Sequence, residues 1–246
     1  MSEIAEVKPG KIADWINSLE PGRYSAKIVG KVPKTFFTNA QSAMSDKTDL
    51  LIDFDFSEAT FGALPKNPFK KFICMSSVKL PKGLPVGNPN WVNPEGICRK
   101  SFEDCDNLES VEIIDGDSDL YTYDSVLYKD TTAVFCPRKR SGEVKIKDGT
   151  AGIDVKAFEL CQKITKINFP DTIEYIGESA FSCARSLTEI ILPPSVRSIG
   201  FRAFESCQSA KHIIIPPTIK RLPDRSLSGL QCDGCSVELN EGLTEI

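Results

Sequence analysis

The sequence predicts an α/β solenoid of short parallel strands, joined by single helical turns and preceded by a small N-terminal α/β cap. Three features predict this fold: an even spacing of similar residues in the second half, apolar residues two apart within each copy, and a first segment that does not repeat. The chain of 246 residues, 41% hydrophobic and 26% charged, has an ordinary globular composition and can bury a substantial core. We expect the cap to span residues 1–60 and the solenoid residues 61–246.

The segment at 1–60 alternates between helical and strand patterns. In KIADWINSLE, at 11–20, the apolar side chains follow i, i+3, i+4, i+7 spacing, which favours a helix. RYSAKIVGK, at 23–31, alternates as a strand does. PKTFFTNAQSAMSD, at 33–46, predicts a second helix, and DLLIDFDFS, at 49–57, a second strand. A solenoid needs such a cap because its first coil would otherwise expose an apolar layer and an unpaired strand edge.

The repeat is marked by an apolar anchor residue, and the last four anchors are evenly spaced, at positions 158, 181, 204 and 227. An apolar residue stands five positions before every anchor, and two more stand nine and eleven positions after each of the first five. A fixed period between about 20 and 29 residues is typical of leucine-rich-type solenoids, in which each unit buries its apolar face against its neighbours. The six anchors are Phe69, Phe102, Phe158, Phe181, Phe204 and Leu227.

Each repeat contains one short strand and one turn region. The apolar residues two apart, as in EIIL at 189–192 and HIII at 212–215, suit a strand with one face inward, and a proline follows and ends it. A second apolar pair, such as Val196 and Ile199, precedes Gly200 at a predicted turn. The anchor fills the middle of the coil, and the short segment around it predicts a single helical turn.

These repeats resemble those of the BspA-like leucine-rich repeat family, of the treponemal type. The resemblance rests on PDTIEYIGESAFSCARSLTEIILP at 170–193, whose Pro, Ile-Gly, Ala-Phe and Ile-x-(Ile/Phe/Leu)-Pro recur at fixed offsets, and it covers roughly residue 61 to the C-terminus. It implies a leucine-rich repeat solenoid of about six 23-residue-type repeats. The stretch YDSVLYKDTTAVFCPRKRSGEVKI looks like the β-hairpin insertion of such proteins, which we place at about 115–147. Asp154 departs from the pattern, because glycine is usual there.

The resemblance implies a non-enzymatic binding protein that uses the sheet face of the solenoid, with attachment to host components as the family's usual association. The alternative is an assembly or scaffold protein inside the cell that pairs through an unfinished C-terminal coil. Leu243 and Ile246 repeat the apolar pair that precedes an anchor, and no anchor follows them. A second copy in a homodimer, a partner or the chain's own residues would cover this end.

The location within or outside the cell is left open by two opposing indications. The first residues contain no apolar run of signal-peptide length, which favours the cytoplasm. The family resemblance instead implies a surface or extracellular protein.

No constellation of residues specifies a reaction, and we expect no enzyme, no cofactor and no metal. The single histidine, His212, falls on the outward side of a strand, and no G-x-S-x-G signature occurs. Asp53 and Asp55 share one strand face, as paired catalytic or calcium-binding carboxylates would. The same alternation follows if Ile52 and Phe54 simply face the core, and we favour this interpretation.

The chain has nine cysteines, an odd number in a chain with its own core, so we expect mostly reduced thiols. Cys232 and Cys235 form one C-x-x-C motif. A loop explains it better than a metal or redox site, because zinc needs two further ligands and a thioredoxin motif needs a βαβ frame. Cys105, Cys161 and Cys207 share one column of the repeat, which predicts a stack of small buried thiols.

The outward side chains of successive strands form columns, with strands about 4.8 Å apart. Opposite charges alternate through the early repeats, whereas isoleucines replace them near the C-terminal end. We expect a protein partner of unknown identity to bind there. The chain has 30 basic and 34 acidic residues, and the basic ones form no long tract, so we do not expect it to bind nucleic acid. No apolar run is long enough to span a membrane, so we do not expect membrane insertion. The predicted binding residues are Glu189, Ile191, His212 and Ile214.

Overall fold

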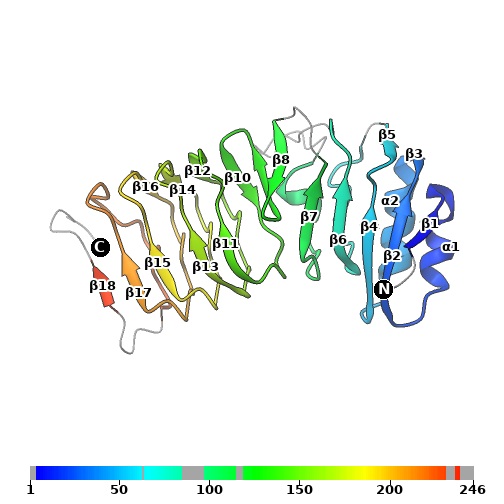
Figure 1. Ribbon diagram of the computed structural model, residues 1–246. Coiled ribbons are helices and arrows are strands. Elements are labelled where there is room, and N and C mark those ends of the chain that lie inside the picture. The colour runs from blue at the N-terminus through cyan, green and yellow to red at the C-terminus, as the bar shows by residue number, and fades with distance from the viewer. Residues whose placement is uncertain (1–3, 63, 85–96, 115–118, 231–235, 239–246) are drawn as a thin grey trace. The chain divides into compact units, whose positions relative to one another are not determined.

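The computed structural model divides into two compact units, unit 1 at Met1–Thr122 and unit 2 at Tyr123–Ile246 (Figure 1). Among the described residues, no helix is both long and apolar enough to cross a lipid bilayer. The structure describes residues 4–62, 64–84, 97–114, 119–230 and 236–238.

Two groups of residues named in the sequence predictions lie outside the described residues. These are the C-x-x-C motif of Cys232 and Cys235, and the apolar pair Leu243 and Ile246 of the predicted unfinished coil.

Unit 1 contains a five-stranded parallel sheet in the order β1-β2-β4-β6-β7, and a two-stranded parallel ladder of β3 with β5. Helix α2 buries an apolar face, and helix α1 packs beside it. The elements are β1 (Ile4–Val7), η1 (Pro9–Lys11), α1 (Ile12–Asn17), β2 (Gly22–Ile28), β3 (Gly30–Val32), α2 (Lys34–Met44), β4 (Leu50–Asp55), β5 (Ala59–Phe61), β6 (Met75–Leu80), η2 (Arg99–Phe102) and β7 (Ser110–Ile113).

The predicted helices and strands of the N-terminal segment are confirmed as α1, β2, α2 and β4. The sequence analysis missed β1, which forms the edge of the sheet, with Ile4 opposite Ser25 in a parallel register. A four-residue strand with only Val7 buried carries too little apolar alternation to be recognised.

Aromatic side chains fill the core of unit 1. The rings of Phe36 and Phe56 meet edge to face, with centroids 5.6 Å apart. The first two anchors, Phe69 and Phe102, stack at 5.7 Å with an interplanar angle of 4°. In the pairing of β6 with β7, Val78 lies opposite Val111. These residues stand at the same distance after their anchors, so the predicted strand register is confirmed in this unit.

Unit 2 contains three sheets, with orders β16-β14-β12-β10-β9-β8, β11-β13 and β15-β17-β18; the boundary between the units falls within β8. Its elements are β8 (Leu120–Tyr123), β9 (Val126–Lys129), β10 (Thr132–Phe135), β11 (Gly142–Lys145), β12 (Gly152–Ile153), β13 (Ile164–Asn168), β14 (Tyr175–Ile176), β15 (Glu189–Ile191), β16 (Ser198–Ile199), β17 (His212–Ile214) and β18 (Ser236–Glu238).

Strands β9 and β10 form an antiparallel hairpin that joins the repeats. Thr132 pairs with Lys129 across the hairpin, and Ala133 pairs in parallel with Ile153 of β12. The hairpin therefore lies next to the first regular repeat of unit 2, and its strand β10 pairs with strand β12 of that repeat.

The outward columns of unit 2 have the register predicted from the sequence. Glu189 of β15 lies opposite His212 of β17, which lies opposite Ser236 of β18. Ile191 lies opposite Ile214 in the same ladder. The prediction of the columns is confirmed because equal spacing in sequence becomes equal position in a parallel ladder.

The segments around the anchors in unit 2 are successive turns, where we expected a single helical turn. Around Phe181, residues Ser179 and Cys183 have positive φ values of 52° and 61°. This alternation turns every second backbone N–H toward the next repeat: Phe181 N donates to Ala203 O at 2.7 Å, and Cys183 N to Glu205 O at 2.8 Å. The turn segments thus form a second hydrogen-bond ladder between repeats, which a helical turn would not provide.

The anchor rings form a stack through the interior of unit 2. Phe158 and Phe181 have centroids 4.9 Å apart, and Phe181 and Phe204 lie 5.2 Å apart with an interplanar angle of 1°. All three side chains are buried. The constant period of the repeat therefore places one phenylalanine directly against the next.

Candidate binding face

The predicted binding residues come together on the outward side of β15 and β17. Ile191 is 42% exposed, whereas its chain neighbour Ile190 is fully buried. Ile214, opposite Ile191, is half-buried, as are Glu189 and His212. The structure thus brings all four residues onto one face of one rigid ladder, which we call the Ile191–Ile214 face.

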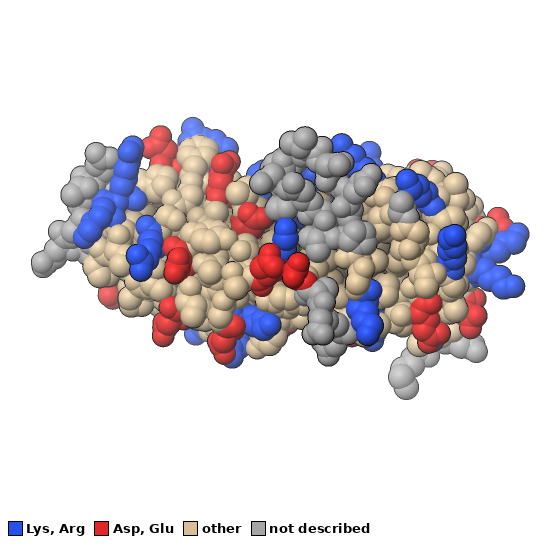
Figure 2. Space-filling view, turned by 90° about the horizontal axis from the view of Figure 1, so that it is seen from above, with Lys and Arg blue, Asp and Glu red and all other residues tan. Residues whose placement is uncertain are grey.

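Charged and polar partners lie beside the two isoleucines. Lys166 of β13 forms an ion pair with Glu189 at 2.9 Å, and the hydrogen bond and charge of Glu189 raise the pKa of Lys166. Figure 2 shows acidic and basic side chains interspersed over the side of the molecule in view. Exposed ion pairs contribute little to stability, so the pair serves mainly to neutralise the charges next to the apolar patch.

A shallow apolar groove of about 420 Å³ adjoins the Ile191–Ile214 face. It lies where the strands of three successive repeats end. Both isoleucines line it, together with Phe169 and the proline pairs at 193–194 and 216–217. Among its lining residues only Asp171 is charged.

The sequence analysis did not foresee this groove. It treated the prolines only as residues that end strands. The doubled prolines recur at the same place in two successive repeats, and this was a usable signal, because a second proline adds rigid apolar surface beyond what ending a strand requires.

His212 and Ser236 lie side by side, as the histidine and serine of a catalytic pair do. His212 Nδ1 and Ser236 Oγ lie 3.1 Å apart, which is a distance that nucleophilic catalysis requires. The acid next to the histidine in the ladder, Glu189, is paired with Lys166 instead of orienting the imidazole. Ser236 is exposed, so within the described part of the chain the pair has neither an orienting acid nor an enclosed site.

The carboxylate pair of β4 is structural. Ile52 and Phe54 are buried, which confirms the favoured interpretation of the alternation. Asp53 accepts two hydrogen bonds from Arg23, at 2.9 and 3.1 Å, and others from Ser77 and Ser76. Burial by itself raises the pKa of Asp53, but these hydrogen bonds outweigh it and hold the pKa below its ordinary value.

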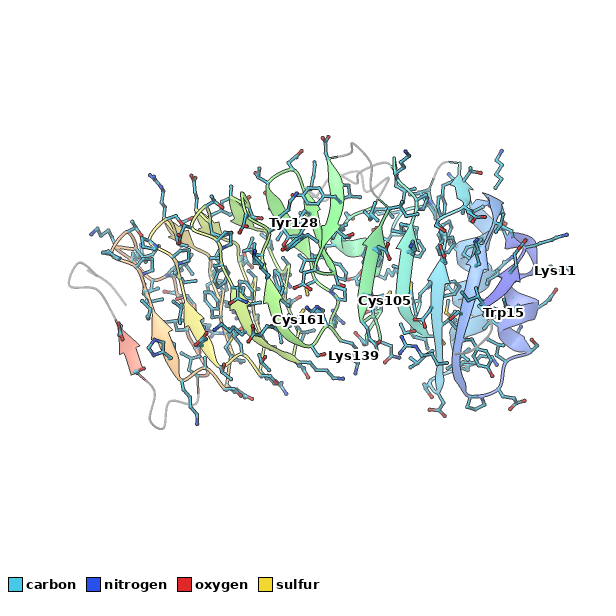
Figure 3. The ribbon with its side chains drawn as sticks, viewed as in Figure 1. Lys11, Trp15, Cys105, Tyr128, Lys139 and Cys161 are labelled. Carbon is cyan, nitrogen blue, oxygen red and sulfur yellow. The ribbon has the colours of Figure 1, made fainter. Side chains whose placement is uncertain are left out.

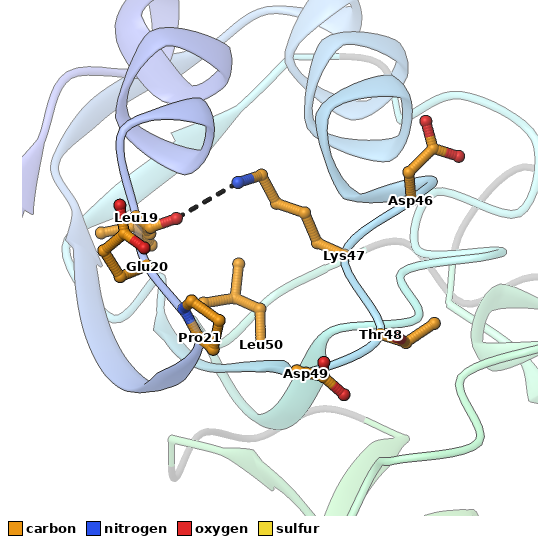
Figure 4. A pocket seen from close by; sticks show the side chains of 8 residues that line it. All are labelled: Leu19, Glu20, Pro21, Asp46, Lys47, Thr48, Asp49 and Leu50. Atoms are coloured by element: carbon orange, nitrogen blue, oxygen red, sulfur yellow. Dashed lines mark hydrogen bonds between the residues drawn. The ribbon is translucent and has the colours of Figure 1, made fainter.

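The described residues contain no group of three His, Cys, Asp or Glu side chains that could hold a metal ion. A small pocket of about 170 Å³ lies between the loop after α1 and the loop after α2 (Figure 4). Glu20, Asp46 and Asp49 line it, and Lys47 crosses it to donate to Leu19 O at 3.2 Å. The lysine thus joins the two loops.

The column of cysteines is buried, as predicted. Cys105 in unit 1 and Cys161 in unit 2 are labelled in Figure 3, and both are almost fully inaccessible, as is Cys207. Cys105 Sγ donates to Phe69 O at 3.0 Å, and Cys207 Sγ to Phe181 O at 3.3 Å, so these two thiols each bond the carbonyl of the anchor one repeat before. Cys161 Sγ instead donates to Cys136 O at 3.6 Å. The seven described cysteines are free thiols.

Burial makes these thiols a source of instability in alkali. Burial raises the pKa of Cys207 from 9.0 to about 12, and that of Cys74 to about 11. Because the folded state favours the protonated thiol, the stabilisation is fully present below pH 9.0 and is lost as the pH rises toward the folded-state pKa. Each such thiol lowers the unfolding free energy by about 1.4 kcal/mol per pH unit in that window.

Urea unfolding at pH 8.0 to 10.5 measures this effect, and we expect Cys207→Ala to show a shallower decline than the native chain. Equal slopes for the two proteins would contradict a contribution from Cys207, whatever the absolute stability of the variant.

The parallel ladders and the constant period of the repeat define a leucine-rich repeat solenoid. The model of the BspA type leucine-rich repeat region matches residues 132–246, with six copies. This part of the chain consists of BspA-type leucine-rich repeats, as the resemblance in sequence indicated. No curated protein matches the chain.

Two solved structures of bacterial proteins have the same fold. A protein from Eubacterium ventriosum matches with a TM-score of 0.55 and 18% identity, over 87% of this chain and 63% of that one. Pneumococcal vaccine antigen PcpA matches with a TM-score of 0.51 and 17% identity, over 87% and 58%. The leucine-rich repeat protein of T. pallidum is 21% identical over 70% of this chain and 65% of that one, with a TM-score of 0.38. The chain therefore spans less than two thirds of each of these proteins.

Proposed function

We propose that this chain is a non-enzymatic binding protein whose Ile191–Ile214 face receives a protein partner. The outward-facing pair of isoleucines, with Ile191 exposed and Ile214 half-buried, carries the proposal. Single exposed apolar residues are ordinary on a protein surface, but here two lie opposite each other in a ladder and border an apolar groove. An apolar centre with polar side chains around it is the usual composition of a protein interface.

The ladder supports binding through its rigidity. Both isoleucines belong to strands that are hydrogen-bonded to their neighbours, and the turn segments are hydrogen-bonded as well. Because this backbone is already ordered, a partner that binds the two isoleucines does so at little cost in conformational entropy of the chain. A small number of central apolar contacts then supplies most of the affinity.

Attachment to a host component is the particular role that the family resemblance suggests for this face. PcpA, whose fold is similar, is a pneumococcal vaccine antigen. Capture of a partner from host-cell extract, compared with capture from extract of the producing cell, distinguishes attachment from a role inside the cell.

Substituting Ile191→Asp or Ile214→Asp tests the face. We expect either variant to lose the captured partner, while the unfolding free energy changes by no more than about 0.5 kcal/mol, because outward side chains leave the core intact. Binding to the immobilised protein and thermal melting are measured together.

Val155→Asp provides the matched control, since Val155 is also an exposed apolar residue, at 38%, but lies in a turn segment away from this ladder. It should keep the partner. Normal melting with undiminished binding in both isoleucine variants would place the interface on another surface.

A further inference from the structure

We propose that the apolar groove takes an extended partner segment in which a large apolar side chain is followed or preceded, two or three residues away, by lysine or arginine. The inference rests on the proposed function and specifies the chemistry of the partner. The apolar side chain would lie between the isoleucines and the proline pairs, and the cation would lie at Asp171.

The shape of the groove requires a segment that runs across the strands. Phe169, Leu192 and Ile215 line it from equivalent positions of three successive repeats, and so do Asp171, Pro194 and Pro217. Neighbouring parallel strands lie about 4.8 Å apart, so three repeats span about 10 Å. An extended chain advances about 3.3 Å per residue, which places about three residues along this length.

The lining selects for an apolar side chain. Proline has no backbone N–H, so the pairs at 193–194 and 216–217 offer no main-chain donor to a polar ligand. Ile191 and Ile214 add branched side chains at the edge of the groove. Pro193 O and Pro216 O already accept hydrogen bonds from Val196 N and Ile219 N, so an apolar partner group leaves these two carbonyls paired when it covers them.

The charge of the groove selects for a cation at one end. Asp171 is exposed, and no ion pair or side-chain hydrogen bond of its carboxylate is found within the described part of the chain. One repeat earlier, the equivalent position is Asp148, which lies outside the groove lining and pairs with Lys145 at 3.5 Å, so Asp171 is the carboxylate that faces a ligand in the groove. The next two equivalents are Pro194 and Pro217, so within the groove lining the acidic character lies at the β13 end and the apolar character at the β17 end. The exposed Glu238 of β18 lies opposite Ile214 in the ladder, but it is outside this lining.

Two pools of synthetic octapeptides test the proposal. Both have leucine at position 4 and random residues elsewhere, with arginine at position 1, 2, 6 or 7 in one pool and glutamate at the same positions in the other. Each pool is passed over the immobilised full chain at low salt, and retained peptides are quantified by mass spectrometry. We expect about two- to fivefold more retention of the arginine pool, since one exposed ion pair contributes about 0.4 to 1 kcal/mol.

Charge reversal provides the decisive comparison. Asp171→Lys should reverse the preference, so that the glutamate pool is retained more, and Ile214→Asp should abolish retention of both pools. Asp224→Lys changes the net charge equally at an exposed residue outside the groove lining, and it should keep the preference for arginine.

Retention of neither pool by the native chain, or a preference that Asp171→Lys leaves unchanged, would overturn this inference. The proposed function would survive that result if the isoleucine variants still lost the captured partner. A partner that both isoleucine variants continue to bind would instead overturn the proposed function itself.

Discussion

Replacing Phe181 with alanine is expected to lower the unfolding free energy by about 3 to 5 kcal/mol. Its ring is buried and stacks on Phe158 on one side and on Phe204 on the other, at 4.9 and 5.2 Å. Removing the ring costs its own burial and leaves a cavity between two rings. The backbone on each side is hydrogen-bonded to the adjacent repeat, so the cavity cannot collapse easily.

Urea unfolding of the full chain measures this change, and Phe201→Ala is the matched control. Phe201 is 38% exposed, and its ring is covered only on one side by the Arg202 guanidinium, at 4.8 Å. This control should cost about 1 kcal/mol or less. If the two variants unfold at the same urea concentration, the anchor stack does not hold the repeats together.

Replacing Gly200 with alanine should destabilise the chain by about 3 kcal/mol, the upper end of the usual cost of overpacking, although only one methyl group is added. A β-carbon at Gly200 would lie 2.4 Å from Glu178 N and 2.6 Å from Gly177 C, which are backbone atoms of the preceding repeat. Backbone atoms cannot rotate away as a side chain can. The two repeats would have to separate, and this would strain both the strand ladder and the turn ladder.

Gly62→Ala provides the control for this substitution. A β-carbon at this exposed glycine would meet no atom within 4 Å, so the stability should change by no more than about 0.5 kcal/mol. Thermal melting of the two variants beside the native chain gives the comparison. A Gly200→Ala variant that melts with the native chain would mean that the repeats can move apart at little cost.

Asp154 shows that a glycine is needed at this position only where the backbone of the preceding repeat comes close. Asp154 stands where Gly177 and Gly200 stand in the next two repeats. Its N–H donates to Ala133 O at 2.9 Å, and Ala133 belongs to the hairpin strand β10 and not to a turn. The crowding that requires glycine arises between two turn segments, so the first repeat after the hairpin accepts a side chain.

Much of the candidate site could be predicted because the period of the sequence becomes a position in space. Residues one period apart occupy the same place in successive repeats, so Ile191 and Ile214 had to be neighbours once the fold was a parallel ladder. The alternation within each strand then determined that Ile190 faces the core and Ile191 faces outward. These inferences need only spacing and polarity.

The sequence by itself thus determined the repeat, its anchors, the strand register and the outward placement of the isoleucines. Only the tertiary structure decided that the anchor segments are turns, that Ser236 lies 3.1 Å from His212, and that doubled prolines from two repeats make one groove. The physical reason is that periodicity specifies which residues are neighbours, whereas turn geometry, side-chain distances and the depth of a surface depend on how several repeats pack at once.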